Sequence, residues 1–372
     1  MEIPNQPLVI DAGSSTIRAG IAGDSEPGFV FPSYIGRVKH DRVMLGGLQG
    51  SEFVGPDAQE NRGLLTLRYP IRRGVVTNWN DIEKLFEAVY KPKKTDVKGL
   101  HSEDHPILIT EPPLNTYKNR QNMAELLFET FHVPAMYVAI PSVLSLYASG
   151  KTNGLTLDVG DGVSYCVPVF KGFAITNAIL RSNMGGSDVT DYLQLLLRKI
   201  GINLMTTAER EIVKEIKENH SLLMVDGAKY KRTENIVYKL PDGQKVEVGK
   251  TELSRAPELL FKPQLIGSEE SSISDLVSNT ISRSDMDLRT TLYQTILLSG
   301  GTTETHKFGD RLLNELKLLS PPSTKLRIFA PPNRSNAAWT GGSILGGLGT
   351  FKKMWITAEE YAENPNKIHQ FN

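Results

Sequence analysis

The chain contains 372 residues, of which 40% are hydrophobic and 23% are charged. This length exceeds what one hydrophobic core usually organises, so we expect two globular domains of roughly 150–200 residues each. Lys plus Arg and Asp plus Glu total 42 each, which excludes a global basic field that would attract nucleic acid. Binding must therefore come from local surfaces.

The sequence also bears on the cellular compartment. The single cysteine, Cys166, cannot form an intramolecular disulfide and is expected to be a small buried hydrophobe in a reducing compartment. The N-terminal residues lack a basic stretch followed by an apolar one, and no run of about 18 apolar residues occurs. We expect a protein of the cytoplasm that does not insert into membranes.

A strand, a glycine turn and a second strand open the chain, and the same pattern returns 147 positions later. Residues 10–15 (IDAGSS) lead into a strand at 17–21, and residues 157–162 (LDVGDG) lead into a strand at 163–170. One such hairpin is an ordinary turn. Two of them, one in each half of the chain, predict a site that holds one nucleotide from both sides.

The residue types in these hairpins suit phosphate and a cation. A glycine turn lets backbone N–H groups approach phosphate oxygens because no Cβ intervenes, and Ser14 and Ser15 add short donors. Asp11 and Asp158 stand at strand ends, where they can hold the water shell of a Mg²⁺ ion.

Strand and helix signals alternate along most of the chain, which indicates an α/β fold. The apolar run 107–110 predicts a strand, and a helix pattern follows the next turn with Asn115 as its expected N-cap. The strand 136–140 leads into a helix that starts at Pro141, a position that helices tolerate for proline.

Later in the chain, Thr206 and Glu209 form a capping-box pattern that starts a charged helix. Segment 224–252, rich in Lys, Asp and Gly, is predicted to be a surface excursion. The strand 295–298 enters a Gly-Gly-Thr-Thr turn before a helix from about Phe308, a natural binding place for an anion or a ribose. By itself this turn would be weak evidence; after two phosphate hairpins it is the expected third element.

Four stretches resemble the actins and actin-related proteins, and the resemblance extends from about Gln6 to the C-terminus. These stretches are 18–24 (RAGIAGD), 64–70 (LLTLRYP), 144–150 (LSLYASG) and 339–344 (WTGGSI). Shorter stretches are more similar to the centractin branch, the actin-related proteins that form the short filament of dynactin. They are 42–44 with 47–50, 255–261, 284–289 and 308–313.

The resemblance implies an actin-like fold with two duplicated, ribonuclease H-like halves around a nucleotide cleft. The first half would comprise residues 1–140, the second 141–340, and 341–372 would return to the first. Carried over residue by residue, it implies that ATP or ADP and a Mg²⁺ or Ca²⁺ ion are held by several groups of residues. The phosphates would contact Gly13, Ser14, Ser15, Arg18, Asp158, Gly160, Asp161 and Gly162; the waters of the cation would contact Asp11 and Asp158; the sugar and base side would contact Lys217 and Glu218; and the adenosine would contact Gly300, Gly301, Thr302 and Thr303. Without the resemblance, Lys217 and Glu218 fit a solvated helix face.

Several positions depart from the family pattern. Pro141 replaces the glutamine whose amide orients the attacking water, and Tyr165 replaces the histidine that helps relay its proton. A phenol with an ordinary pKa near 10 is a poor proton acceptor at neutral pH. Hydrolysis is therefore expected to be slow or absent. Arg18 replaces a lysine at the phosphates, and Thr305 and Ser335 replace an aromatic residue and a lysine near the adenine.

The resemblance also implies self-association. In the family, the loop that corresponds to residues 39–51 inserts into the next subunit. Here its apolar residues Val43, Met44, Leu45 and Leu48 would fill a groove near Tyr147 and Phe173. Such a head-to-tail contact generates a filament. The loop 265–272, an apolar plug in actin, carries Ser268, Glu269 and Glu270, so cross-strand contacts are expected to differ.

These expectations combine into a structural protein of the cytoplasm and cytoskeleton. Its partners would be other copies of itself, other dynactin subunits, cytoplasmic dynein and cargo adaptors, with no nucleic acid. Two alternatives stay open at this point. One is an active ATPase, whether a conventional actin or a kinase of the wider sugar-kinase and Hsp70-like group; the other is a nuclear actin-related subunit of a chromatin-remodelling complex.

Overall fold

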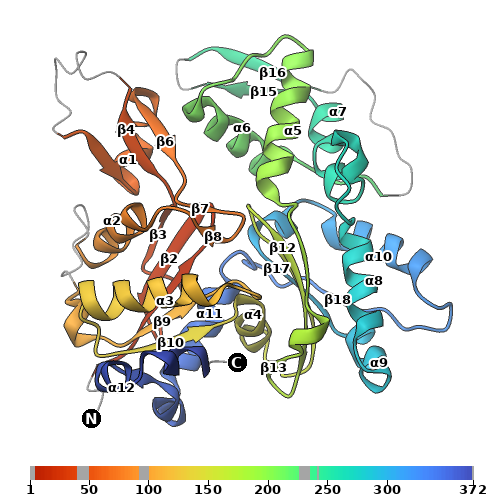
Figure 1. Ribbon diagram of the computed structural model, residues 1–372. Coiled ribbons are helices and arrows are strands. Elements are labelled where there is room, and N and C mark those ends of the chain that lie inside the picture. Colours follow the sequence, from red (N-terminus) through yellow and green to blue (C-terminus); the bar gives the residue numbers. More distant parts are fainter. Residues whose placement is uncertain (1–4, 40–49, 92–99, 226–234, 241–242, 371–372) are drawn as a thin grey trace. The chain divides into compact units, whose positions relative to one another are not determined.

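The computed structural model describes residues 5–39, 50–91, 100–225, 235–240 and 243–370. The chain forms two compact units (Figure 1). Unit 1 comprises Met1–Thr152, Lys171–Ala174 and Asn336–Asn372, and unit 2 comprises Asn153–Phe170 and Ile175–Ser335. Each unit combines helices with a mixed sheet, which confirms the α/β class.

The division differs from the boundaries expected after residues 140 and 340. The helix α4 (Pro141–Ala148) belongs to unit 1, and the chain returns to unit 1 at Asn336. Packing explains the difference, because α4 lies against α11 (Ala337–Gly347) so closely that a Cβ on Gly341 would clash with the backbone of Leu144 (Figure 1). Local sequence patterns carry no signal for a contact between helices so distant in the chain.

Unit 1 is built around one mixed sheet. The strands of the unit, some of which lie outside this sheet, are β1 (Leu8–Ala12), β2 (Thr16–Ile21), β3 (Phe29–Pro32), β4 (Ile35–Val38), β5 (Glu52–Val54), β6 (Leu65–Arg68), β7 (Ile71–Arg72), β8 (Val75–Val76), β9 (Ile107–Thr110), β10 (Ala135–Ala139), β13 (Phe173–Ala174) and β19 (Ile356–Thr357). The central sheet has the order β19-β10-β9-β1-β2-β3. β1, β9 and β10 are parallel, whereas β1 and β2 form the antiparallel hairpin expected from the sequence.

The helices of unit 1 pack against its strands and against one another. Besides α4 and α11 they are α1 (Pro56–Glu60), α2 (Trp79–Tyr90), α3 (Tyr117–Glu125) and α12 (Ala358–Glu363). α2 contributes Phe86 to a buried cluster with Ile10 of β1 and Ile107 of β9. On α11, the indole N–H of the fully buried Trp339 donates to the carbonyl oxygen of Val9 at 3.1 Å, which anchors this late helix to the first strand.

Unit 2 repeats the arrangement of an antiparallel hairpin beside parallel strands. Its strands are β11 (Gly154–Val159), β12 (Ser164–Phe170), β14 (Leu180–Ser182), β15 (Asn235–Lys239), β16 (Lys245–Gly249), β17 (Ile296–Ser299) and β18 (Ile328–Phe329). The sheet runs β12-β11-β17-β18, with β14 on the other side of β12. β11 and β12 are antiparallel, and β11, β17 and β18 are parallel.

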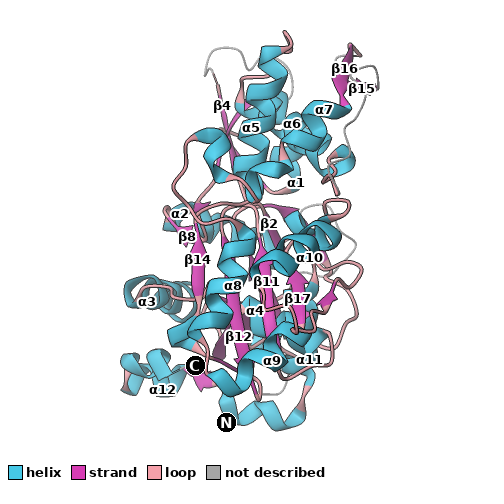
Figure 2. Ribbon diagram, turned by 90° about the vertical axis from the view of Figure 1, so that its right-hand side faces the viewer, coloured by secondary structure: helices cyan, strands magenta, loops and turns pink. Residues whose placement is uncertain are grey.

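Some helices of unit 2 pack against this sheet, and the others pack against one another. They are α5 (Gly186–Lys199), α6 (Thr207–His220), α7 (Lys250–Arg255), α8 (Ile273–Arg283), α9 (Met286–Gln294) and α10 (Phe308–Leu319). Figure 2 shows β11, β12 and β17 side by side, with α8 next to β12. Cys166 of β12 is fully buried and carries a free thiol, as expected.

Two local expectations were wrong or incomplete. The cap of α3 is Thr116, whose hydroxyl accepts from the backbone N–H of Asn119, and Asn115 instead accepts from the Asn119 side chain. The backbone of Leu114 is left-handed, with φ of 60°, which delays the start of the helix. The excursion at 224–252 contains the β15–β16 hairpin, and one of its faces packs against the core of unit 2.

In the part of the chain that the structure describes, no helix has the length and apolar character that crossing a bilayer requires.

Candidate functional site

The first hairpin, in unit 1, ends in a tight turn after β1. The backbone N–H of Gly13 donates to the carbonyl oxygen of Thr16 at 3.1 Å, which closes the turn. The hydroxyl of Ser14 accepts from the backbone N–H of Gly74 at 3.1 Å, so the turn is tied to the loop between β7 and β8. The carbonyl of Ser15 accepts from Ser33 N–H at 2.9 Å. These bonds fix the backbone of residues 13–15.

Asp11 and Arg18 face one another across this hairpin. They are directly paired in the register of β1 and β2, and Arg18 Nη1 lies 3.7 Å from Asp11 Oδ2. The other carboxylate oxygen of Asp11 accepts from the Thr110 hydroxyl at 2.8 Å. Arg18 Nε donates to Oδ1 of Asn336 at 2.7 Å. Both side chains are thus held in place, and the guanidinium still carries further N–H donors for a phosphate.

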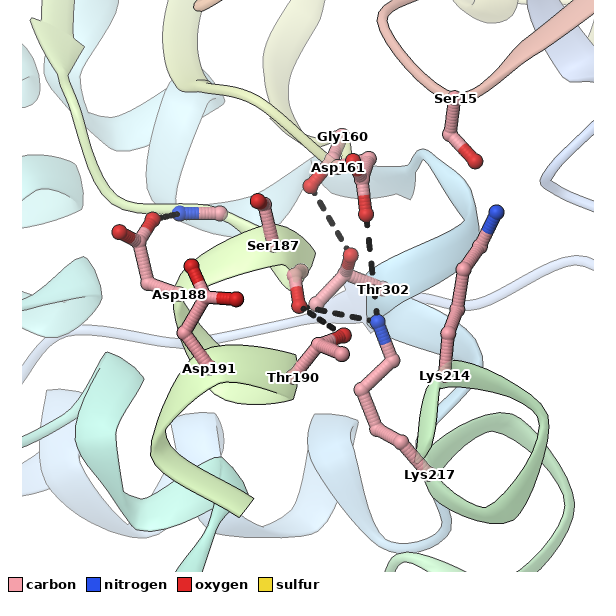
Figure 3. A network of polar contacts seen from close by, with 12 residues as sticks. Ser15, Gly160, Asp161, Ser187, Asp188, Thr190, Asp191, Lys214, Lys217 and Thr302 are labelled. Carbon is pink, nitrogen blue, oxygen red and sulfur yellow. Dashed lines mark hydrogen bonds and ion pairs between the residues drawn. The ribbon is translucent and has the colours of Figure 1, made fainter. Parts of the chain in front are cut away.

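The second hairpin, in unit 2, is supported by helix α5 and by the turn after β17 (Figure 3). The carbonyl oxygen of Gly160 accepts from the backbone N–H of Gly186 and from the hydroxyl of Thr302, both at 2.9 Å. The carbonyl oxygen of Asp161 accepts from Ser187 N–H at 2.7 Å. Because the carbonyls of the turn are satisfied by the protein, its backbone is fixed before any ligand arrives.

Lys217 is the buried cation of this site. Its side chain extends from α6, and its Nζ donates to the carbonyl oxygen of Gly186 at 2.9 Å and lies 4.0 Å from Asp161 Oδ1 (Figure 3). Burial lowers the pKa of this ammonium from its usual value, and Asp161 opposes that shift. A desolvated cation beside a glycine turn strongly favours an anion. The next residue, Glu218, is exposed to solvent.

At three glycine positions around the second turn, the neighbouring atoms leave no room for a side chain. A Cβ on Gly300, whose φ is +84°, would lie 2.6 Å from Asp158 Oδ1, and one on Gly186 would lie 2.5 Å from Thr302 Oγ1. A Cβ on Gly185 would clash with the carbonyl oxygen of Asp161. Sequence reasoning identified Gly300 but missed Gly185 and Gly186. The available signal was the spacing of Gly185 and Asp188, whose carboxylate accepts from Gly185 N–H at 2.8 Å.

The turn after β17 uses its threonines for internal bonds. It is a short helical turn, Gly301–Glu304, in which the buried Thr303 donates its hydroxyl to Gly300 O at 2.7 Å and accepts from Arg334 Nε at 2.8 Å. Ser335, expected near the adenine, donates its backbone N–H to Glu304 at 3.0 Å. These side chains therefore shape the turn, and of its two glycines Gly301 is the exposed one.

The two residues that depart from the hydrolytic pattern are well defined. Pro141 is the first residue of α4, and its carbonyl oxygen accepts from the hydroxyl of Ser145 at 2.9 Å. Tyr165 lies on β12 directly opposite Asp158 of β11. Burial raises the pKa of the Tyr165 phenol to about 12. Neither side chain can accept a proton from water at neutral pH.

The residues expected at a polymer contact are only partly described. Val43, Met44, Leu45 and Leu48 lie outside the described residues, as does most of the loop 39–51. Tyr147 of α4 donates its hydroxyl to the carbonyl oxygen of Gly172 at 2.8 Å. Phe173, the next residue along, is 67% exposed. The structure therefore brings Tyr147 and the Phe173 segment together within unit 1.

Among the described residues, no group of three or more His, Cys, Asp or Glu side chains is placed to hold a metal ion directly. A Mg²⁺ ion that keeps most of its waters and contacts phosphate does not require such a group.

Comparisons with known proteins place the chain among well-defined relatives. The family described as Actin matches residues 3–370. An "Actin-like protein" of Neurospora crassa is 50% identical over an alignment of 375 positions that covers 98% of this chain and 97% of that protein. The "Centractin" of Schizosaccharomyces pombe is 44% identical over 370 residues, again 98% of this chain and 97% of that protein.

Proposed function

The chain belongs to the actin family, and we propose that it is a polymerising structural subunit whose bound nucleotide stabilises the protomer more than it drives turnover. Actin-family proteins bind a nucleotide together with a divalent cation. The nucleotide part of the proposal rests on the position of Lys217. Its buried ammonium is directed at a turn where the surrounding atoms leave no room for side chains at the glycine positions.

Each hairpin, within its own unit, carries groups that suit a phosphate or its cation. In unit 2, Gly160, Gly162 and Lys217 would contact the phosphates or sugar of ATP or ADP. In unit 1, the fixed turn at 13–15 and the remaining donors of Arg18 would hold phosphate oxygens. Asp11 and Asp158 would face the water shell of Mg²⁺ or Ca²⁺. When bound, the cation would neutralise phosphate charge.

Low turnover is the second part of the proposal. Hydrolysis requires a group that orients water and a group that accepts its proton. Pro141 has no side-chain donor or acceptor, and the Tyr165 phenol, with its raised pKa, stays protonated. Because phosphoryl transfer depends on positioning, the absence of both functions supports slow hydrolysis. An active ATPase would need another residue for each role.

Self-association is the third part. A fold that keeps nearly the full length of its actin-family relatives, together with an exposed Phe173 beside a fixed Tyr147, supports a head-to-tail contact that repeats along a filament. Val43, Met44, Leu45 and Leu48 of the next subunit would contact this surface.

The assembly we propose is the short filament of dynactin. The support is the similarity to centractin over nearly the whole chain and the centractin-like stretches at 255–261 and 308–313. In that assembly the subunit would contact other dynactin components, cytoplasmic dynein and cargo adaptors in the cytoplasm.

Affinity purification of the tagged protein from gently lysed cells, followed by mass spectrometry, tests the assembly. Recovery of dynactin and dynein subunits is the expected result. Recovery of chromatin-remodelling subunits, or of myosin and actin-binding proteins, would contradict the dynactin assignment while leaving family membership intact. A parallel assay of phosphate release by the purified protein tests the low turnover, which a rate equal to that of conventional actin would refute.

A further inference from the structure

Tyr165 carries a buried hydroxyl that no residue in the described part of the chain satisfies. Its side chain is 4% exposed, and its hydroxyl finds no hydrogen-bond partner among the residues that the structure describes. An unsatisfied buried hydroxyl costs about 1–3 kcal/mol and is uncommon in native proteins. Phenylalanine would fill the same space without that cost. The hydroxyl therefore points to a partner outside the described residues, such as a bound ligand.

The neighbours of Tyr165 indicate the charge of that partner. In the register of unit 2, Tyr165 is paired with Asp158 on one side and with Arg181 of β14 on the other. Directly paired residues project on the same face of a sheet, so the three side chains form one row. The guanidinium carbon of Arg181 lies 5.8 Å from the centre of the Tyr165 ring. A cation and an O–H donor adjacent to the phosphate turn favour an anionic acceptor.

The position of this row within the sheet indicates which phosphate it would meet. Thr302 follows β17, which flanks β11, whereas Arg181 lies on β14, which flanks β12. The turn that carries Thr302 and the Tyr165 row are thus on opposite sides of the β11–β12 hairpin. A nucleotide whose sugar lies near Thr302 and Lys217 and whose phosphates cross the turn would direct its last phosphate to Tyr165.

We propose that the Tyr165 hydroxyl donates a hydrogen bond to the terminal phosphate of a bound nucleoside triphosphate, so that the protein retains ATP in preference to ADP. The inference rests on the proposed nucleotide-binding function and names the ligand state that this site selects. A protonated phenol can donate but cannot accept the proton of an attacking water. The same residue that slows hydrolysis would therefore hold the unhydrolysed nucleotide.

The test compares the wild type with Tyr165→Phe and with a matched control, Tyr90→Phe. Tyr90 is also a buried tyrosine whose hydroxyl has no hydrogen-bond partner among the described residues, but it lies on α2 and contacts Phe131. Each purified protein is loaded with labelled ATP or labelled ADP, and the release of label is followed during a chase with unlabelled nucleotide. Thermal unfolding without nucleotide is measured for all three.

Tyr165→Phe is expected to speed ATP release at least about tenfold, because a hydrogen bond to a charged group is lost. ADP release should change less than about twofold, and Tyr90→Phe should match the wild type for both nucleotides. Equal effects on ATP and ADP, or no effect on either, would overturn the inference and leave the hydroxyl to a bound water. Wild-type protein that retains neither nucleotide would instead refute the nucleotide part of the proposed function.

A third arm separates the terminal phosphate of ATP from free phosphate. ADP-loaded proteins are titrated with inorganic phosphate, and binding is followed by the line width of its ³¹P signal. If Tyr165→Phe weakens phosphate binding but leaves ATP release unchanged, the hydroxyl holds a free phosphate, and the preference for ATP is refuted. A change in ATP release supports the inference whether or not free phosphate also binds.

Discussion

Arg18 and Tyr165 occupy the same position in two related hairpins: each is the cross-strand partner of the aspartate that is the last but one residue of the first strand. Asp11 and Asp158 are 147 positions apart, and so are Arg18 and Tyr165. One hairpin thus places a permanent cation beside its aspartate, and the other places a neutral donor. Both residues can hold phosphate oxygens, and neither can serve as a base at neutral pH.

Restoring the two missing functions should increase hydrolysis. The double variant Pro141→Gln with Tyr165→His is expected to release phosphate from ATP at least about tenfold faster than the wild type, because a water-orienting amide and a proton acceptor are both supplied. The measurement is a phosphate-release assay on the purified protein. Pro141→Ala is the control, since it changes the first residue of α4 without adding an amide. An unchanged rate in the double variant would mean that other residues limit turnover.

Removing the buried ammonium should weaken nucleotide binding without unfolding the protein. In Lys217→Met, the carbonyl oxygen of Gly186 still accepts from the hydroxyl of Thr190, and Asp161 is partly solvated. We expect the Kd for ATP and for ADP to rise at least about tenfold, from the loss of one charge-assisted contact. Thermal unfolding at several nucleotide concentrations measures this change. Lys214→Met, on the same helix, should have a smaller effect; equal effects would contradict a specific role for Lys217.

The local elements of this fold follow well from the sequence. Both hairpins, the burial of Cys166 and the capping box of α6 were expected, and in that box Thr206 and Glu209 exchange the two hydrogen bonds that define it. These features depend on residues that are neighbours in the chain. A glycine turn or a helix cap can therefore be recognised from a short stretch of sequence.

The features that sequence reasoning missed depend on distant contacts. Gly186 must be glycine because Thr302 occupies the space of its Cβ, and no pattern near Gly186 reveals this. The β15–β16 hairpin was expected at the surface because of its polar composition. Side chains along its strands point alternately to the two faces, so Val248 lies in the core while Val237 is exposed. Composition alone does not reveal the apolar face of a hairpin when the other face carries charged residues.

The conformation of Gly300 provides a sharp test of the second turn. Alanine at this position would require a left-handed backbone and would place its Cβ against Asp158 and the carbonyl of Val159. We expect Gly300→Ala to lower the free energy of unfolding by at least about 2 kcal/mol. Gly301→Ala is the matched control, because its Cβ would be 3.7 Å from Ser335, an ordinary contact. Urea denaturation measures the free energy of unfolding of both variants. Equal values would contradict the geometry described for Gly300.

A charged network in unit 1 should give a pH-dependent contribution to stability. Hydrogen bonds from Lys84 and then from Arg37 lower the pKa of Glu52 below 4.5. Because the folded pKa is below the unfolded one, the contribution is complete above about pH 4.5 and is lost as the pH falls through the folded pKa. Glu52→Gln should cost about 0.5–1 kcal/mol at pH 7, since the carboxylate is partly exposed.

Urea denaturation of wild type and Glu52→Gln at pH 7, 5 and 4 checks this sign. The difference in the free energy of unfolding should be similar at pH 7 and 5 and should begin to shrink at pH 4. A difference that grows toward acid would show that the pKa of Glu52 is raised rather than lowered in the folded protein.

Phe173 should matter for self-association and not for the folding of the protomer. Its ring is 67% exposed, while the preceding Gly172 has φ of +84° and accepts a hydrogen bond from Tyr147, so the segment is fixed and its aromatic side chain is presented to solvent. Phe173→Ser is expected to shift the unfolding temperature by less than about 2 °C, because little buried area is lost. In sedimentation assays, the concentration needed for assembly should rise at least about tenfold, as for an aromatic residue at the centre of an interface. Leu318→Ser, which alters an 83% exposed residue on α10, is the control for nonspecific loss of apolar surface. If both variants assemble like the wild type, the filament contact lies elsewhere on the protomer.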